Sequence, residues 1–422
     1  MKKVFFISML FLLTALMTTG LYAQNPINIT QDKECVSVFQ NIKTICDNDN
    51  GKLWGINLYA PILCINKSRN IWSNQKDPQG LLNEHDGYFT GTYPETKNVA
   101  NSTTEAFGQK WATIMLPFPP DSIELITLVC HEMFHYWQDT LNLVPSKIDY
   151  NNTHMDKKDA RILLKLEWTA LYSACKANDI FSRKEAISNG LTFRKLRHKI
   201  FNEFYNDETA FEIHEGLAQY TGRKLATQSD SLYIEFLNKD FESNINKNDY
   251  VRSFAYFSGE ILGFLLDESK TNWRKQINEN SDLGVILQQA YQIKLPSNLE
   301  KQYESIKNKY GYKDIYYFEE KRDSIKSQEK ETLRKIFSKN IKELPLKNVN
   351  ISFDPNSVVP IEDIGNAYKN ARVIDNWGIL ETKDNGVIVI TNDWKTIILP
   401  YADRIEIKEN IEETEYWKLT TK

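Results

Sequence analysis

The segment LVCHEMFHYWQDTL, residues 128–141, places two histidines and a glutamate at a spacing that suits metal chemistry. His131 and His135 are four residues apart, so on a helix their side chains stand above one another and can hold one cation. Zn²⁺ prefers imidazole nitrogen, and a catalytic zinc needs a third protein ligand and an open position for water. Glu132 lies about a quarter turn from His131, beside that open position, where it can take a proton from a zinc-bound water. The pattern predicts a catalytic Zn²⁺ site with Glu132 as its general base.

The surroundings of this motif favour a metal site over the alternative, which is two ordinary polar residues on a helix face. The HExxH pattern alone is moderately specific. Apolar residues flank it, and Asp121 with Glu124 three residues later has the form of a capping box that opens a helix. We therefore expect a helix from Asp121 that carries the histidine pair, with the preceding strand as the edge strand of a substrate cleft.

Three residues are candidates for the third ligand, and the sequence leaves all three open. Glu215 is favoured, because it lies in FEIHEGLAQYTG, on an expected helix whose Gly216 and Gly222 would let another helix approach closely. Glu167 lies in LLKLEWTALYSA among apolar residues, and a buried carboxylate must be paired, protonated or bound to metal. His154, in NNTHMD, is the third candidate, although a loop histidine near a helix start is its more ordinary interpretation. If Glu215 binds the metal, Glu167 is expected to orient a ligand histidine.

The order of three motifs resembles the gluzincin metallopeptidases of the aminopeptidase N and glycyl aminopeptidase types: HEMFH, then EGLA in HEGLAQY, then YFSG in FAYFSGEILGFLLDE. In those families two histidines and a glutamate bind zinc, and a tyrosine stabilises the oxyanion. The resemblance implies that His131, His135 and Glu215 are the zinc ligands. It also implies that Glu132 is the general base and Tyr256 the oxyanion donor. The fold that it implies is a thermolysin-like zincin core, with a small N-terminal sheet and a mainly helical catalytic domain.

The chain departs from these families at two points. Residues 136–214, 79 in all, separate His135 from Glu215, so a helical segment that contains Glu167 must be inserted. Residues 90–120 contain no segment like GxMEN, which holds the free substrate amine in the aminopeptidases. The sequence therefore favours another kind of hydrolase over an aminopeptidase.

Two further side chains near these motifs have roles that the sequence leaves open. Tyr256 is either the oxyanion donor or an aromatic side chain packed between Phe254 and Phe257. His214 directly precedes Glu215, and we expect it to point to the side of their helix and to be structural.

The elements that must position these residues fall into three stretches, which predict an α+β protein. Residues 24–120 contain strand patterns such as LWGINLYAPILCIN, GYFTGTY and WATIMLPFP. Residues 121–345 have almost entirely helical patterns, with a capped start at Ser297 and Glu300. Within them, the charged segment EEKRDSIKSQEKETLRKIFSKNIKE is expected to form a solvent-exposed helix. Residues 346–422 alternate apolar and turn residues, which indicates a small all-β module.

The N-terminus has the form of a secretory signal peptide, with two lysines, an apolar stretch and small residues before the expected cleavage point after Ala23. The alternative is an uncleaved anchor helix. No later segment approaches a membrane span. Residues 1–23 therefore predict a secreted or periplasmic protein without stable membrane insertion after cleavage.

Export would permit disulfides among the five cysteines. Cys35 and Cys46 are close in sequence and could pair. Cys130 and Cys175 lie in apolar helical patterns, where a small buried thiol is expected.

The composition is that of a globular protein, with 41% apolar and 26% charged residues and a formal net charge of -4. This charge argues against a general nucleic-acid binder and favours a small-molecule or peptide partner. For the metallopeptidase that the motifs predict, this partner is a peptide or protein substrate. We therefore predict a secreted zinc metallohydrolase, and specifically a peptidase that cleaves amide bonds with a glutamate-activated water. The alternative is a non-catalytic exported binding protein that has a structural zinc and uses its C-terminal module as an interaction surface. Glu132 favours the enzyme, because a structural site needs no base and usually closes with a fourth protein ligand.

Overall fold

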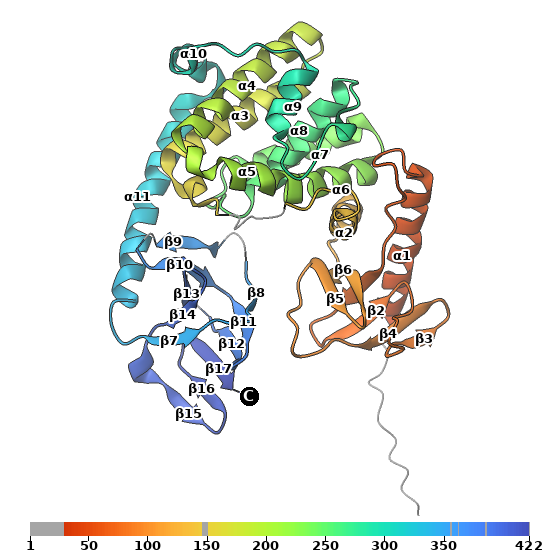
Figure 1. Cartoon of the computed structure of the whole chain (residues 1–422), viewed down its shortest axis with the longest axis vertical. Helices are drawn as coiled ribbons and strands as arrows, with labels where there is room; N and C mark the ends of the chain where they lie inside the picture. The colour runs from red at the N-terminus through yellow and green to blue at the C-terminus, as the bar shows by residue number, and fades with distance from the viewer. Residues whose placement is uncertain (1–28, 146–150, 355–356, 362, 385, 422) are drawn as a thin grey trace, which may run out of the picture.

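The fold is α+β and has three parts, as Figure 1 shows. The computed structural model describes residues 29–145, 151–354, 357–361, 363–384 and 386–421. Within them, a six-stranded mixed sheet and one long helix form the N-terminal part, ten α-helices form the central region, and two antiparallel sheets form the C-terminal part. The predicted signal peptide lies outside the described residues. None of the described helices is long and apolar enough to cross a membrane.

The N-terminal sheet has the strand order β3-β4-β2-β1-β6-β5, so β5 forms one edge. Its strands are β1 (Ile62–Ile65), β2 (Asn70–Ser73), β3 (Asn83–His85), β4 (Tyr88–Thr92), β5 (Ser102–Ala106) and β6 (Gln109–Met115). Strands β1 and β6 run parallel, and the other neighbours are antiparallel. One face of the sheet packs into the main hydrophobic core with the helices, and the other covers a smaller apolar cluster of its own.

Two details of the predicted strands are wrong. The strand expected from Leu53 begins only at Ile62, because Gly51 and Gly55 adopt positive φ values of 75° and 81° and turn the chain first. The strand that precedes the histidine helix, β6, is not the edge, because β5 pairs with its outer side. The edge strand is therefore β5, whose polar sequence STTEA does not have an apolar strand pattern.

Helix α1 (Ile29–Asp49) is an addition to the predicted β-rich part. Cys35, Phe39, Ile42 and Cys46 recur at helical spacing and are buried in the main core. Cys35 and Cys46 lie three turns apart, about 16 Å along the axis, which is too far for a disulfide. All five cysteines lie among the described residues, and each is free and buried.

The described part of the central region has ten helices, of which α2 to α9 contribute side chains to the main apolar core that packs against the N-terminal sheet. They are α2 (Ser122–Trp137), α3 (Lys158–Cys175), α4 (Ile180–Ile200), α5 (Tyr205–Phe211), α6 (Leu217–Thr227), α7 (Asp230–Asn244), α8 (Phe254–Glu268), α9 (Leu283–Ala290), α10 (Leu299–Ile306) and α11 (Tyr312–Ile336). Asp121 caps α2 as predicted, because its carboxylate accepts from the backbone N–H groups of Ile123 and Glu124. The cap of α10 is Asn298 and not the predicted Ser297.

Helix α11 contains most of the charged segment and is not merely solvent-exposed. Glu319 is buried, accepts a hydrogen bond from Arg161 of α3 at 2.7 Å and forms an ion pair with Lys165 of α3 at 2.6 Å. Arg322 is also buried and pairs with Asp156, just before α3. These buried pairs fix the first half of α11 to the central region, and its second half extends to the C-terminal part.

The C-terminal part consists of two sheets with the strand orders β7-β14-β13-β10-β9 and β15-β16-β17-β12-β11-β8. The strands are β7 (Lys342–Pro345), β8 (Asn350–Ser352), β9 (Val359–Ile361), β10 (Gly365–Lys369), β11 (Arg372–Asp375), β12 (Gly378–Thr382), β13 (Val387–Thr391), β14 (Thr396–Leu399), β15 (Glu406–Lys408), β16 (Ile411–Glu413) and β17 (Trp417–Thr421). A shared apolar cluster packs the two sheets together. Strand β7 precedes the predicted boundary at residue 346 and pairs with β14.

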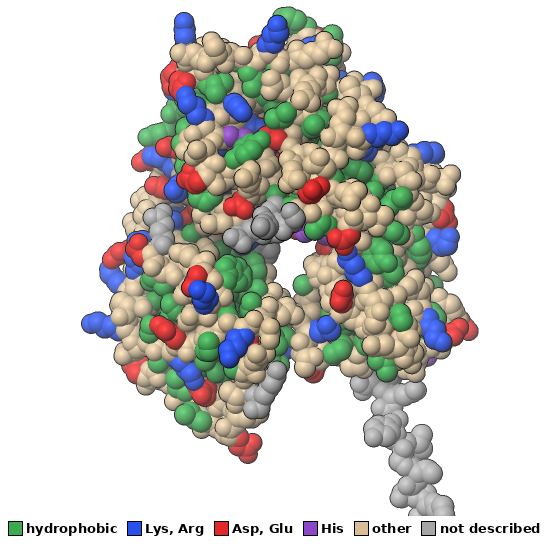
Figure 2. Space-filling view, viewed as in Figure 1, with side chains coloured by type: hydrophobic (Ala, Val, Ile, Leu, Met, Phe, Trp, Pro, Cys, Tyr) green, Lys and Arg blue, Asp and Glu red, His purple; other side chains and the backbone are tan. Residues whose placement is uncertain are grey.

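The three parts surround an opening, which Figure 2 shows at the centre of the molecule. The central region lies above the opening in this view, the N-terminal sheet on its right and the C-terminal part on its left.

Candidate metal centre

Helix α2 carries the HExxH residues on its second half and is held in place by α6. The apolar side chains of Val129, Met133 and Phe134 are buried in the main core. A Cβ atom on Gly222 of α6 would lie 2.3 Å from the carbonyl oxygen of Thr127, so only glycine allows this approach. The predicted close contact of a helix at Gly222 is therefore confirmed, and the neighbour is the histidine helix itself.

Glu215 lies in a π-helical turn, Glu212–Gly216, between α5 and α6. Such a turn inserts one extra residue into a helix, and it recurs at functional sites. Helix α8 crosses this turn at a contact of two glycines: a Cβ on Gly259 would lie 2.2 Å from Gly216 Cα. This contact brings Tyr256, one turn earlier on α8, next to Glu215.

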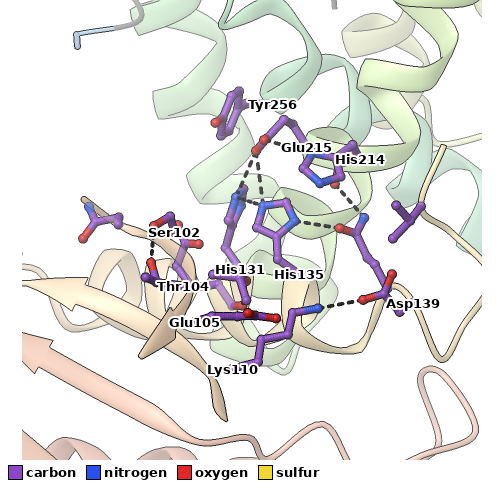
Figure 3. A pocket seen from close by; sticks show the side chains of 15 residues that line it. Ser102, Thr104, Glu105, Lys110, His131, His135, Asp139, His214, Glu215 and Tyr256 are labelled. Carbon is purple, nitrogen blue, oxygen red and sulfur yellow. Dashed lines mark hydrogen bonds and ion pairs between the residues drawn. The ribbon is translucent and has the colours of Figure 1, made fainter. Parts of the chain in front are cut away.

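The side chains of His131, His135 and Glu215 converge, as Figure 3 shows. Oε2 of Glu215 lies 3.2 Å from His131 Nε2 and 3.4 Å from His135 Nε2, and the two Nε2 atoms are 3.0 Å apart. Tetrahedral Zn²⁺ with ligand bonds near 2.05 Å would separate its ligand atoms by about 3.3 Å. The three atoms therefore fit three corners of a zinc tetrahedron and leave the fourth corner free of protein ligands among the described residues.

The two other candidates for the third ligand lie in a separate buried network. Glu167 accepts from Arg194 at 3.2 Å and from Arg197 at 2.6 Å, so the prediction that it orients a ligand histidine is wrong. His154 is fully buried in a short 3₁₀ turn before α3 and contacts Glu208 at 3.0 Å. Neither side chain joins the group of ligand atoms around Glu215.

The same network positions the π-helical turn. Arg194 donates to both carboxylate oxygens of Glu212, the first residue of the turn, and to Asp282 at 3.2 Å. All three side chains are at least nine-tenths buried. Because these paired charges are buried, breaking them would be costly, so they hold Glu212, three residues before Glu215, in place.

Glu132 is 5% exposed, and its Oε2 atom has no hydrogen-bond partner among the described residues. Burial raises the pKa of Glu132 to about 8, against a smaller opposing effect of His135. A divalent cation at the neighbouring ligands would lower this pKa again, because it stabilises the carboxylate. Beside the three converging side chains, the buried Oε2 atom of Glu132 therefore makes no structural hydrogen bond to the described residues.

The ligand side chains already have the charge pattern of a metal site. Burial lowers the pKa of His131, and Glu215 only partly offsets this. For His135, burial is outweighed by the carboxylates of Glu215 and Glu132, which raise its pKa to about 9. Burial raises the pKa of Glu215, but the histidines outweigh it and hold that pKa well below its usual range. These pKa directions favour an ionised Glu215 carboxylate beside a protonated His135 when no metal is bound.

Gln138 is a residue of this site that the sequence analysis missed. It is fully buried, and its Oε1 accepts from His135 Nδ1 at 2.7 Å. In the neutral imidazole that a metal would bind, this hydrogen bond fixes the proton on Nδ1 and leaves the Nε2 lone pair of His135 directed at the site. Its Nε2 donates to the carbonyl oxygens of Ile213 and His214 at 3.2 and 2.9 Å. Gln138 thus ties α2 to the π-helical turn, and its spacing of three residues from His135 was the only signal in the sequence.

Tyr256 and His214 both line the site (Figure 3). The Tyr256 ring stacks on His131 with centroids 5.4 Å apart, and burial together with Glu215 raises the pKa of its hydroxyl well above the usual value. His214 stacks on His135 at 4.5 Å, and its Nδ1 lies 3.1 Å from Glu215 Oε1. The prediction that His214 points to the side of the helix is wrong, because the π-helical turn rotates it into the cleft.

These side chains lie in a cleft of about 450 Å³. The edge strand β5 forms one wall of the cleft, through Ser102, Thr103, Thr104 and Glu105. Lys110 of β6 contributes a positive charge that pairs with Asp139 at 2.8 Å. His131, His135 and Glu215 thus face a polar groove that is bordered by the edge strand β5.

The contact between Gly259 and Gly216 makes a direct prediction. Replacing Gly259 by alanine should destabilise the fold by about 1–3 kcal/mol, because the methyl group meets backbone that cannot move aside. It should also weaken zinc binding, since α8 and the turn that carries Glu215 are forced apart. Thermal unfolding without metal and competitive zinc titration would measure the two effects.

The matched control is Gly190→Ala on α4, where the atoms closest to the added methyl belong to a side chain, that of Leu171 at 2.8 Å, and not to the backbone. A zinc affinity for Gly259→Ala equal to that of Gly190→Ala would contradict the role of the glycine contact.

Comparisons of this chain with protein families, with curated proteins and with solved structures find no match.

Proposed function

We propose that this protein is a zinc-dependent metallohydrolase that cleaves peptide amide bonds, with a gluzincin-like site on a thermolysin-like zincin core. The observation that carries the proposal is the convergence of His131, His135 and Glu215 at tetrahedral spacing. Beside them lies the Oε2 atom of Glu132, for which the described residues offer no hydrogen-bond partner. The motif order HEMFH, HEGLA and YFSG supports the same assignment of ligands.

The catalytic roles follow from the positions of the side chains. Zinc, when bound, supplies Lewis-acid activation of water and of the substrate carbonyl. Glu132 accepts the proton of the attacking water at Oε2, the atom that no described residue engages in a hydrogen bond. As the amide C–N bond breaks, Glu132 delivers this proton to the leaving nitrogen, so that the carboxylate is regenerated.

Tyr256 is placed to stabilise the oxyanion that forms when water adds to the carbonyl. Its ring lies against His131, and its hydroxyl lies within hydrogen-bonding reach of Glu215. The high pKa of this hydroxyl keeps it protonated, so it acts as a hydrogen-bond donor and not as a base. A donor held in position before the reaction costs no reorganisation when the charge appears.

The backbone of β5 supports a peptide as the substrate. Phe107 and Gly108 form a two-residue turn with φ values of 53° and 84°. From that turn, every second residue of β5 exchanges backbone hydrogen bonds with β6, and the residues between them do not. Ala112 of β6 donates to Pro61 on its other side at 2.8 Å. The residue opposite it, Thr103, therefore directs its backbone N–H and C=O groups away from β6 and into the cleft, as does Glu105 two residues later. An extended peptide can pair with these groups as an additional strand.

The alternative, an exported binding protein with a structural zinc, has less support. A structural zinc normally takes four protein ligands, and here three converge. A buried acid without a partner is costly, and it has no purpose in a structural site. The signal-peptide pattern of residues 1–23 supports placement of either protein outside the cytoplasm.

A metal-removal experiment tests the proposal. Protein treated with a chelator and dialysed should not cleave a random peptide library, and one equivalent of Zn²⁺ should restore cleavage, because the three ligands form one site. Mass spectrometry of the products would measure cleavage, and metal analysis would measure stoichiometry. A zinc-loaded protein that cleaves no peptide in the library would favour the binding protein.

A further inference from the structure

Three main contacts, which we call joints, connect the parts of the molecule that border the opening in Figure 2, and two of these joints are extensive. The N-terminal sheet joins the central region through the main hydrophobic core. Helix α11 joins the central region through the buried pairs of Glu319 and Arg322. Leu333 of α11 and Phe337, which directly follows the helix, pack against β9, β10 and β13, so the C-terminal part is fixed to this end of α11.

The third joint is small and polar, and we call its residues Asn98, Asn350 and Arg372 the latch. Asn98, in the chain between β4 and β5, donates to the carbonyl oxygen and the side-chain oxygen of Asn350 at 3.1 and 3.2 Å. Arg372 of β11 donates to Asn98 Oδ1 at 2.7 Å and to the carbonyl oxygen of Glu95 at 3.2 Å. The hydrophobic clusters of the described residues do not span this contact. Hydrogen bonds of this kind contribute little net stability, so the latch is the joint that opens most easily.

The latch lies beside the proposed catalytic cleft. Asn98 precedes Asn101, the first residue of the cleft wall, by three residues, which span at most about 10 Å. A small cavity at the latch is lined from one side by Asn98 and Met115, and from the other by Ser352 and Arg372. The free edge of β5 therefore runs from the proposed zinc ligands toward the C-terminal part.

We propose that the latch limits the substrates of the cleft to a single extended polypeptide segment. A peptide strand that pairs with β5 would continue past Asn101 toward the opening, which the latch closes on the side of the C-terminal part. A folded domain attached to that strand would therefore meet the N-terminal and C-terminal parts together. Exclusion of this kind acts through steric clash with the wrong substrate and needs no added contact with the right one. This inference rests on the proposed peptidase function and adds the substrate class to it.

The test compares one cleavable sequence in two settings, as a free linear peptide and as a surface loop of a stable folded domain. Zinc-loaded wild-type protein should cleave the linear peptide and leave the folded domain intact. Asn98→Ala combined with Arg372→Ala should raise the rate on the loop relative to the peptide by at least about 10-fold, because the latch no longer closes the opening. The control is Arg404→Ala, which removes an exposed ion pair to Glu415 in the same part of the molecule.

A locked variant tests the opposite change. Asn98→Cys with Asn350→Cys, joined by a short bismaleimide, should cleave the linear peptide at the wild-type rate and not cleave the loop. The natural cysteines are buried, so the reagent should select the new pair. An unchanged ratio of loop to peptide cleavage in both variants would overturn the role of the latch and leave the peptidase proposal intact. Failure of the wild type to cleave either substrate would instead overturn the peptidase proposal, and the substrate limit with it.

Discussion

Replacing Glu132 by glutamine should leave zinc binding unchanged and reduce peptide cleavage by about 10²- to 10⁴-fold, the usual contribution of a general base. Glutamine has the shape of glutamate but cannot accept the proton of the attacking water. The carboxylate oxygen at issue has no partner among the described residues, so its replacement breaks no structural hydrogen bond there. The metal-free fold should also gain stability near neutral pH. In the wild type, burial raises the pKa of Glu132 to about 8, so the side chain must take up a proton on folding at neutral pH, and glutamine removes this cost.

The measurement is kcat on a linear peptide, together with zinc content and thermal unfolding of the same samples. Glu185→Gln is a suitable control, because it changes an exposed glutamate that pairs with Lys309 far along the chain. Full activity of zinc-loaded Glu132→Gln would remove Glu132 from the mechanism. Loss of zinc in this variant would instead assign the residue to the metal.

The second large effect concerns the third ligand. Glu215→Ala should weaken zinc binding by more than about 100-fold, since loss of a ligand exceeds the 10- to 100-fold effect of a residue that only orients one. Glu167→Ala should keep the zinc and lose about 3–5 kcal/mol of stability, because Arg194 and Arg197 lose a buried partner. His154→Ala should also keep the zinc, because His154 pairs with Glu208 and not with the site.

Competitive zinc titration and chemical unfolding of the three metal-free variants separate these outcomes. The decisive result is the pattern across the set: only Glu215→Ala should change the zinc affinity, and Glu167→Ala should change stability the most. Zinc loss in Glu167→Ala without loss of stability would contradict the placement of Glu167 in the arginine network.

Much of the candidate site could be predicted because its signals are local. The helical spacing of His131 and His135, the cap at Asp121 and the glycines around Glu215 are short-range patterns. The same holds for the three-part α+β organisation, since runs of strand and helix patterns succeed one another along the chain.

The remaining features depend on contacts between distant segments. Arg194 and Arg197, which decide the role of Glu167, lie on the next helix, and the sequence does not show which acids they meet. The π-helical turn rotates His214 into the cleft, whereas a regular helix would direct it elsewhere. The role of Gln138 depends on its hydrogen bonds to the carbonyl oxygens of that turn, which a distant part of the sequence supplies. Burial of Glu319 within α11 likewise depends on its partners from α3.

The separation of the ligands along the chain also sets an order of events during folding. His131 and Glu215 are 84 residues apart, and α3, α4 and α5 lie between them. Closing a loop of this length without the intervening contacts carries a large entropic cost, so zinc should not nucleate this fold. Arg194 of α4 must first pair with Glu212 before the π-helical turn can position Glu215. Metal uptake should therefore be a late step, and the rate at which refolding protein acquires zinc should report the docking of α4.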